Sequence, residues 1–175
     1  STGHLPRGDK SKDPRRIVNS AFSPTPHDVV TELLKLASVS KSDAVLDLGS
    51  GDGRIVIKAA LEHGCRATGY ELDGALVRSS RQEAKEAGVS DRVDFHHADL
   101  FTADLTQSDV VTLYLLPIQN ERLIPQLRQL RTGARVVSHH FNIPGVKPDR
   151  VVEFESQESG ESHKLFLYSA PLKGL

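Results

Sequence analysis

The stretch VLDLGSGDG, residues 45–53, decides the fold class of this chain. A short apolar run carries Asp47 near its end, and glycines then alternate at positions 49, 51 and 53. RIVIKAA, residues 54–60, follows directly with helical spacing of its apolar residues. A strand, a glycine turn and a helix in this order bring bare backbone N–H groups and a helix N-terminus against a bound ligand. The stretch therefore predicts the ligand loop of an α/β fold.

The spacing of the glycines narrows the range of ligands that this loop is expected to bind. A dinucleotide fingerprint is Gly-x-Gly-x-x-Gly, but position 54 is Arg and the third glycine comes one residue early. The pattern acid-x-Gly-x-Gly-x-Gly resembles the first motif of the class I, seven-strand S-adenosylmethionine (AdoMet) methyltransferases. On this resemblance, the predicted cofactor loop comprises Asp47, Gly49, Ser50, Gly51 and Gly53.

Two further acids end the next predicted strands. Glu71 closes strand 66–71, and a carboxylate at about this distance from a glycine turn accepts hydrogen bonds from both ribose hydroxyls. Asp99 follows strand 92–97, and the resemblance implies that it accepts from the adenine amino group while the Leu100 N–H meets a ring nitrogen. Leu72, which follows Glu71, belongs to the same predicted site. The alternative for Glu71 is a solvated acid at a strand end.

Composition sets the outer bounds of the function. At 175 residues the chain is long enough to bury a core without disulfides, and its net charge of −1 gives no general attraction to nucleic acid or anionic membranes. We therefore expect no specific nucleic-acid partner. Cys65 is the single cysteine, which excludes an intrachain disulfide and fits a reducing cytoplasm, the expected location, although a removed targeting segment would leave no trace. No apolar run reaches the roughly 18 residues of a membrane span.

No metal site is predicted. His96 and His97 resemble a ligand pair, but adjacent residues of a strand face opposite ways. Asp94 is expected on the surface for the same reason, and Asp73 is expected to cap the next helix.

Hydrophobic periodicity organises the chain. Residues 1–20 are polar and locally basic, and we expect a tail, either native or a cloning remnant, ahead of a single domain over 21–175. Thr25 followed by Pro26 and Asp28 predicts a capped helix start. The pattern predicts helices at 26–37, 53–63, 74–87 and 119–131, and strands at 44–48, 66–71, 92–97, 109–115, 134–140, 150–156 and 163–169. The alternation predicts a parallel sheet covered on both faces, with a C-terminal hairpin.

Four stretches sharpen the resemblance. They are FSPTPHDVV (22–30), DLGSGDGRIVI (47–57), VVTLYLL (110–116) and TGARVVSH (132–139). Together they look like the small archaeal broad-specificity protein-lysine methyltransferases and the mitochondrial lysine methyltransferases of the adenine nucleotide translocase and the ATP synthase c subunit. The likeness runs from residue 22 to about residue 170, and Ser23 departs from it where the family usually has an apolar residue.

The resemblance implies a fold, a cofactor and a substrate class. The fold is a Rossmann-like three-layer sandwich with a seven-stranded, mostly parallel sheet of order 3-2-1-4-5-7-6 and an antiparallel last strand. The cofactor is AdoMet, with S-adenosyl-L-homocysteine as product and no metal. The acceptor is a protein with exposed lysines, and the enzyme is expected to be a monomer.

Three residues are candidates for the chemistry itself. Tyr114, at the carboxyl end of the fourth predicted strand, is expected near the methyl group, where it would orient an amine. The alternative is that Tyr114 is a core aromatic residue. His139 ends the next strand and is a candidate general base, because its reference pKa lies near working pH. The alternative is a rim histidine that holds a loop. Thr25 is expected over the methionine end of the cofactor, with simple helix capping as its alternative.

Other reactions leave different patterns. Methyltransferases that act on nucleic-acid bases usually carry Asn/Asp-Pro-Pro-Tyr/Phe where this chain has YLLP, residues 114–117. Catechol-type enzymes need metal-binding carboxylates, and none cluster at the ends of the fourth and fifth strands. A small-metabolite methyltransferase and a non-catalytic nucleotide-binding module remain open. The hairpin acids Glu153, Glu155, Glu158 and Glu161 are a candidate attractor for lysine-rich surfaces, or simply a solvated face.

Overall fold

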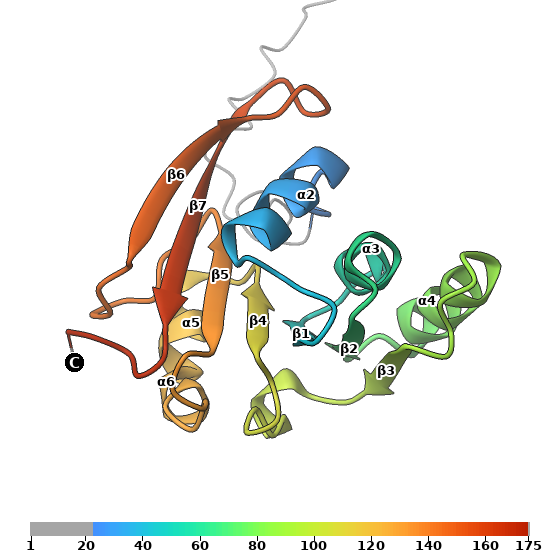
Figure 1. The fold of residues 1–175 in the computed structure, drawn as a ribbon, viewed down its shortest axis with the longest axis horizontal. Helices are drawn as coiled ribbons and strands as arrows, with labels where there is room; N and C mark the ends of the chain where they lie inside the picture. Colours follow the sequence, from blue (N-terminus) through green and yellow to red (C-terminus); the bar gives the residue numbers. More distant parts are fainter. Residues whose placement is uncertain (1–22, 175) are drawn as a thin grey trace, which may run out of the picture.

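The computed structural model describes residues 23–174, and their seven strands form one sheet. The predicted tail over residues 1–20 lies outside the described residues. The strands are β1 (Ala44–Leu48), β2 (Arg66–Glu71), β3 (Val93–His97), β4 (Val110–Leu113), β5 (Arg135–His139), β6 (Arg150–Glu155) and β7 (Ser162–Ser169). Their order is β3-β2-β1-β4-β5-β7-β6, with β7 antiparallel to both of its neighbours. This confirms the predicted fold class and strand order (Figure 1).

Helices cover both faces of the sheet, as the apolar strands require. On one face lie α2 (His27–Leu36), α3 (Arg54–His63) and α4 (Gly74–Glu86). On the other lie α5 (Pro117–Arg122), α6 (Ile124–Leu127) and the short 3-10 turn η2 (Leu100–Thr102) (Figure 1). Two buried hydrophobic clusters, one on each face, hold the three layers together.

The last predicted helix is wrong in its extent. The structure has two shorter helices in place of the predicted helix 119–131. The first, α5, begins two residues before the predicted start, and the second, α6, ends at Leu127. Pro125 falls inside the predicted span and has no backbone N–H to donate, so a continuous helix is not sustained there. Strands β4 and β5 are also shorter than predicted by one to two residues at their ends.

The predicted cap of α2 is also wrong. The N-cap residue is Pro26, and Thr25 makes no capping bond because its hydroxyl bonds across the fold to His139 instead. The backbone N–H groups of His27 and Asp28 are satisfied by the Glu158 carboxylate from the β6–β7 turn. Asp73, by contrast, caps α4 as predicted, with its Oδ1 accepting from the Ala75 N–H at 2.9 Å.

A reciprocal clasp joins this turn to α2. Glu158 accepts from the helix start, and the Asp28 carboxylate accepts from the Ser156 hydroxyl at 2.8 Å and the Gln157 N–H at 2.9 Å. The β6–β7 turn thus lies beside the first turn of α2 (Figure 1). The clasp fixes the segment that precedes α2, and that segment forms one wall of the candidate site.

Candidate active site

A cavity of about 750 Å³ opens at the carboxyl ends of β1, β2 and β4. It lies where the strand order reverses between β1 and β4, the place where open α/β sheets bind ligands. Nine of the residues predicted from the sequence line it: Thr25, Asp47, Gly49, Ser50, Gly51, Glu71, Leu72, Leu100 and Tyr114. Gly53, Asp99 and His139 do not line it.

The glycine turn has the backbone that its sequence predicts. Gly49, Gly51 and Gly53 have φ angles of 84°, 56° and 82°, in the left-handed region that side chains disfavour. A Cβ on Gly51 would meet no atom within 4 Å, so this glycine leaves open space beside the cavity. A Cβ on Gly53 would come within 2.9 Å of the Phe95 ring and the Ser80 hydroxyl. Gly53 therefore serves close packing of α3 and not the cavity.

Glu71 ties two cavity loops together. Its Oε1 accepts from the Gly51 N–H and its Oε2 accepts from the Asp73 N–H, both at 2.9 Å. Each carboxylate oxygen retains a further acceptor site. Glu71 is therefore held at the end of β2 with acceptor capacity beside the cavity, as the predicted ribose contact requires.

Asp47 is a buried carboxyl at the base of the cavity, with an exposed fraction of 3%. Its Oδ1 accepts from the Thr112 hydroxyl at 2.8 Å. Burial raises the pKa of the Asp47 carboxyl to about 7, and the charges of Glu71 and Asp52 act in the same direction. A cation in the cavity would favour the ionised form of Asp47.

Arg54, which breaks the dinucleotide pattern, has a local task that the sequence did not reveal. Its Nη2 and Nε donate to Asp52 at 2.6 and 3.1 Å, and its Nη1 donates to the Thr25 carbonyl at 3.0 Å. It therefore holds the segment before α2 against the cavity. Among the described residues that line the cavity, Arg54 is the only cation, whereas Asp47, Asp52, Glu71 and Asp73 are acids.

His139 lies behind the cavity wall. It is 1% exposed, and its ring centroid is 4.1 Å from that of Tyr114. Its Nδ1 bonds to the Thr25 hydroxyl at 3.0 Å and its Nε2 bonds to His163 Nδ1 at 2.8 Å. Burial, with smaller effects from His163 and His140, lowers the pKa of His139 to about 3. The ring is neutral, and both of its nitrogens are hydrogen-bonded to other side chains. These properties fit a histidine that holds a loop better than they fit a general base.

Tyr114 lines the cavity and is half-buried between the rings of His139 and Phe141. Burial, with the charge of Glu161, raises the pKa of its phenol, which keeps the hydroxyl protonated at neutral pH. His163 had no distinguishing signal in the sequence, because its strand reads as an ordinary hairpin strand.

Asp99 faces its own loop. Its Oδ1 accepts from the Phe101 N–H at 2.9 Å and so caps η2. Its neighbours Ala98 and Leu100 line the cavity. A contact between Asp99 and an adenine amino group stays a prediction.

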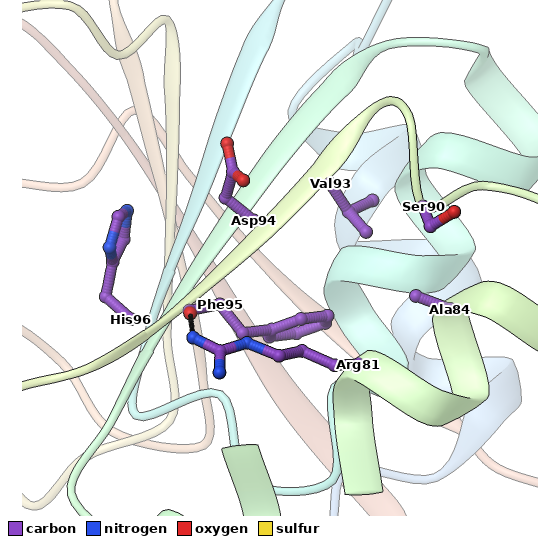
Figure 2. A pocket seen from close by; sticks show the side chains of 7 residues that line it. All are labelled: Arg81, Ala84, Ser90, Val93, Asp94, Phe95 and His96. Carbon is purple, nitrogen blue, oxygen red and sulfur yellow. Dashed lines mark hydrogen bonds between the residues drawn. The ribbon is translucent and has the colours of Figure 1, made fainter. Parts of the chain in front are cut away.

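A second depression of about 330 Å³ lies at the β3 edge of the sheet, against β3 and α4 (Figure 2). Arg81 reaches across it to donate to the Phe95 carbonyl at 2.7 Å, while Asp94 and His96 are exposed. It shares no residue with the candidate site. Within residues 23–174, no three His, Cys, Asp or Glu side chains are grouped to hold a metal ion. No helix in this range is long and apolar enough to cross a membrane.

Comparisons with known proteins agree with this geometry. A protein-lysine N-methyltransferase of Saccharolobus islandicus is 38% identical over 149 residues, 84% of this chain and 91% of that protein. The mouse adenine nucleotide translocase lysine N-methyltransferase is 44% identical over 110 residues, and this chain spans about half (48%) of its length.

A solved structure from the comparisons is also similar over most of this chain. A crystal structure from Salinibacter ruber, described as an RNA methyltransferase in complex with S-adenosyl-L-homocysteine, has 47% identity and a TM-score of 0.79. The match covers 85% of this chain and 94% of that one. The model of the ANTKMT methyltransferase domain matches residues 47–150, from the buried acid of β1 to the start of β6. With the archaeal relative similar over most of both chains, these findings show that this chain belongs to the ANTKMT methyltransferase domain family.

Proposed function

We propose that this methyltransferase transfers the methyl group of AdoMet to lysine side chains of proteins. The observation that carries the proposal is the cavity at the ends of β1 and β4, walled by the glycine turn, Glu71 and a set of acids. The archaeal relative, similar along 91% of its length, is a protein-lysine N-methyltransferase. The Salinibacter neighbour holds S-adenosyl-L-homocysteine, the product that methyl transfer from AdoMet leaves.

The residues present fit AdoMet. The open space at the Gly51 Cβ position lets a ligand approach the backbone, and Glu71 offers carboxylate oxygens to ribose hydroxyls. The buried Ser50 hydroxyl has no partner within the described residues, so it is available to a ligand atom. The excess of acids at the cavity complements a cofactor that carries a sulfonium and an ammonium. When bound, AdoMet supplies a methyl group on a positively charged sulfur.

The residues of the chain have one main task, which is to orient a neutral amine. A lysine with a reference pKa near 10.4 is neutral in only about one molecule in a thousand near pH 7.4, so deprotonation requires roughly 4 kcal/mol. An apolar wall that includes Leu72, Leu115 and Leu116 removes water from the amine, and this desolvation lowers the pKa of the lysine. Tyr114 lines the same cavity, and orienting the amine is the role that we propose for it.

The test is methyl transfer from labelled AdoMet to three separate extracts: protein, RNA and small metabolites. We expect label on protein lysines, identified by mass spectrometry of peptides. Label confined to RNA would support the second candidate, which the 47% identical Salinibacter protein favours by its description. Label confined to small molecules would support a metabolite methyltransferase.

The negative charge at the cavity argues against RNA as the methyl acceptor. Nucleic-acid binding draws most of its affinity from cations that neutralise phosphates. Arg54 is the single cation among the described lining residues, and Asp52 already pairs with it. The predicted monomeric state and cytoplasmic location stay predictions.

A further inference from the structure

Four side chains form a continuous hydrogen-bonded series from the cavity to the surface, here called the Thr25–Ser159 chain. The Thr25 hydroxyl bonds to His139 Nδ1 at 3.0 Å, His139 Nε2 bonds to His163 Nδ1 at 2.8 Å, and His163 Nε2 bonds to the Ser159 hydroxyl at 2.7 Å. Thr25 lines the cavity, His139 is buried, His163 is half-buried and Ser159 is exposed in the β6–β7 turn. The series joins the candidate site to solvent through three elements far apart in the sequence.

We propose that His163 is a positioning residue that acts through His139 to orient the Thr25 hydroxyl. In this orientation the Thr25 oxygen accepts a hydrogen bond from an N–H of the substrate lysine. The inference rests on the proposed function, because the amine is that of a lysine. It adds His163 and a role for Thr25 that neither motif nor family membership assigns.

The chain has a direction because each neutral imidazole donates from one nitrogen and accepts at the other. If Thr25 donates to His139 Nδ1, then His139 donates from Nε2 to His163 Nδ1, and His163 donates from Nε2 to Ser159. In this direction the Thr25 oxygen keeps its lone pairs for the cavity. In the reverse direction His139 donates to Thr25, which leaves the hydroxyl hydrogen free to point into the cavity.

The forward direction suits the reaction. A lysine enters as a donor of N–H groups, and it must aim its lone pair at the methyl group when it attacks. An oxygen that accepts one N–H from the side holds the nitrogen in that orientation. The reversed Thr25 hydroxyl would present a hydrogen to an N–H group, which is repulsive.

Protonation of His163 reverses the chain. A protonated ring donates from both nitrogens, so His163 Nδ1 then donates to His139. His139 must accept at Nε2 and carry its single proton on Nδ1, because burial keeps this ring neutral. His139 then donates to Thr25, and the hydroxyl loses its forward orientation.

Other charged and titratable groups near the two rings are already engaged or lie on the exposed side. Tyr114 of β4 stacks on His139, and His140, after β5, is exposed with its ring centroid 6.3 Å away. In the β6–β7 turn, Glu158 accepts from the start of α2, where Asp28 is occupied by Ser156 and Gln157, and Glu161 is exposed. His163 is therefore the group whose protonation state sets the direction.

Two substitutions separate positioning from packing. His163→Phe keeps a ring but removes the acceptor for His139 Nε2. We expect kcat/KM for a lysine peptide to fall about tenfold at pH 8, the upper end of the range for losing a hydrogen bond between neutral groups. His163→Asn keeps an acceptor oxygen near the position of Nδ1, so this variant should retain most of the wild-type rate. Unlike histidine, asparagine cannot gain a proton. His63→Phe, at the last residue of α3 and outside the cavity lining, is the matched control and should behave as the wild type.

The pH profile is the second readout. Lysine deprotonation affects every variant equally, so it cancels in the ratio of His163→Asn to wild-type kcat/KM. This ratio should rise as the pH is lowered from 8 to 5.5, if protonation of His163 reverses the chain. A flat ratio, or a His163→Phe variant as active as the wild type with folding and AdoMet affinity intact, would overturn the inference.

The third readout needs no activity. Nitrogen-15 NMR of the protein should show His139 protonated on Nε2 at pH 8 and on Nδ1 at pH 5.5, with the change absent in His163→Asn. An unchanged His139 tautomer across this range contradicts the proposed reversal. If the wild-type protein methylates no lysine in any extract, the proposed function fails, and that result is distinct from normal lysine methylation by His163→Phe.

Discussion

At the scale of single residues, the cavity is lined by acids that are buried, such as Asp47, or that accept two backbone hydrogen bonds, such as Glu71. Glu71 and Asp47 sit in one site but in different states, because Glu71 accepts from two backbone N–H groups while Asp47 is almost fully buried with one hydroxyl donor. The same residue class therefore supplies a half-buried hydrogen-bond acceptor, Glu71, and a carboxyl whose charge depends on what fills the cavity, Asp47.

Replacing Glu71 tests the ribose contact. Glu71→Ala should weaken AdoMet binding by roughly 1.5–3 kcal/mol, the range for a hydrogen bond to a charged group. Calorimetric titration measures the change. Glu83→Ala, on the exposed face of α4, is the matched control and should leave the affinity unchanged. Equal affinities in the two variants would contradict the assignment of Glu71.

Replacing Asp47 tests its raised pKa. In the unfolded chain Asp47 ionises near pH 4, whereas in the folded protein it retains its proton until about pH 7. Between these values the folded state binds more protons, so this group makes the free energy of unfolding fall as pH rises, by about 1.4 kcal/mol per pH unit.

Asp47→Asn keeps an acceptor for Thr112 and removes the titration. Its free energy of unfolding relative to the wild type should therefore increase between pH 4.5 and pH 7, as measured by urea denaturation in the absence of ligand. Asp94→Asn, at an exposed site on β3, should show no such trend. A constant difference between Asp47→Asn and wild type would mean that Asp47 titrates normally.

At the scale of elements, the β6–β7 turn and the start of α2 hold each other. Glu158 satisfies the N–H groups that the first turn of a helix leaves without partners. Glu158→Ala should speed amide hydrogen exchange at His27 and Asp28 and in the segment before α2. Glu155→Ala, exposed on β6, is the control and should leave these amides protected. Unchanged exchange in Glu158→Ala would show that the clasp does not stabilise this end of α2.

The same turn bears on the predicted attraction of lysine-rich proteins. All four acids are exposed, but Glu158 also holds the start of α2, so Glu153, Glu155 and Glu161 are the ones that can be changed without disturbing that contact. Attraction of this kind is screened over a Debye length of about 8–10 Å, so KM for a basic protein should rise with ionic strength. Reversing these three charges should remove the salt dependence. If the dependence persists unchanged, the hairpin is only a solvated face.

At the scale of the whole molecule, binding of a ligand to the folded state alone must raise its stability. At a concentration one hundred times its Kd, a ligand adds about 2.7 kcal/mol. AdoMet and S-adenosyl-L-homocysteine should therefore raise the midpoint of thermal unfolding, and NAD should not, because the glycine spacing departs from the dinucleotide pattern. Stabilisation by NAD and not by AdoMet would overturn the cofactor assignment.

Sequence by itself determined the features whose determinants are local. The strand, glycine turn and helix around residues 45–60 are contiguous, and their glycines adopt the positive φ angles that the motif requires. Glu71 lies at the end of β2, at the distance from the glycine turn that the predicted ribose contact requires, and the family resemblance supplied the strand order that the structure confirms. Even locally the pattern has a limit, since apolar periodicity across Pro125 predicted a helix that proline interrupts.

Tertiary structure alone decided the contacts between distant segments. Thr25 reads as a helix cap in sequence, but its hydroxyl bonds to His139, 114 residues away, and the cap comes from Glu158, 131 residues from His27. Arg54 and His163 carry no signal in the sequence, because their partners are set by how the sheet brings the segment before α2, β5 and β7 together. A local pattern describes what a residue can donate or accept, and only the fold supplies the partner.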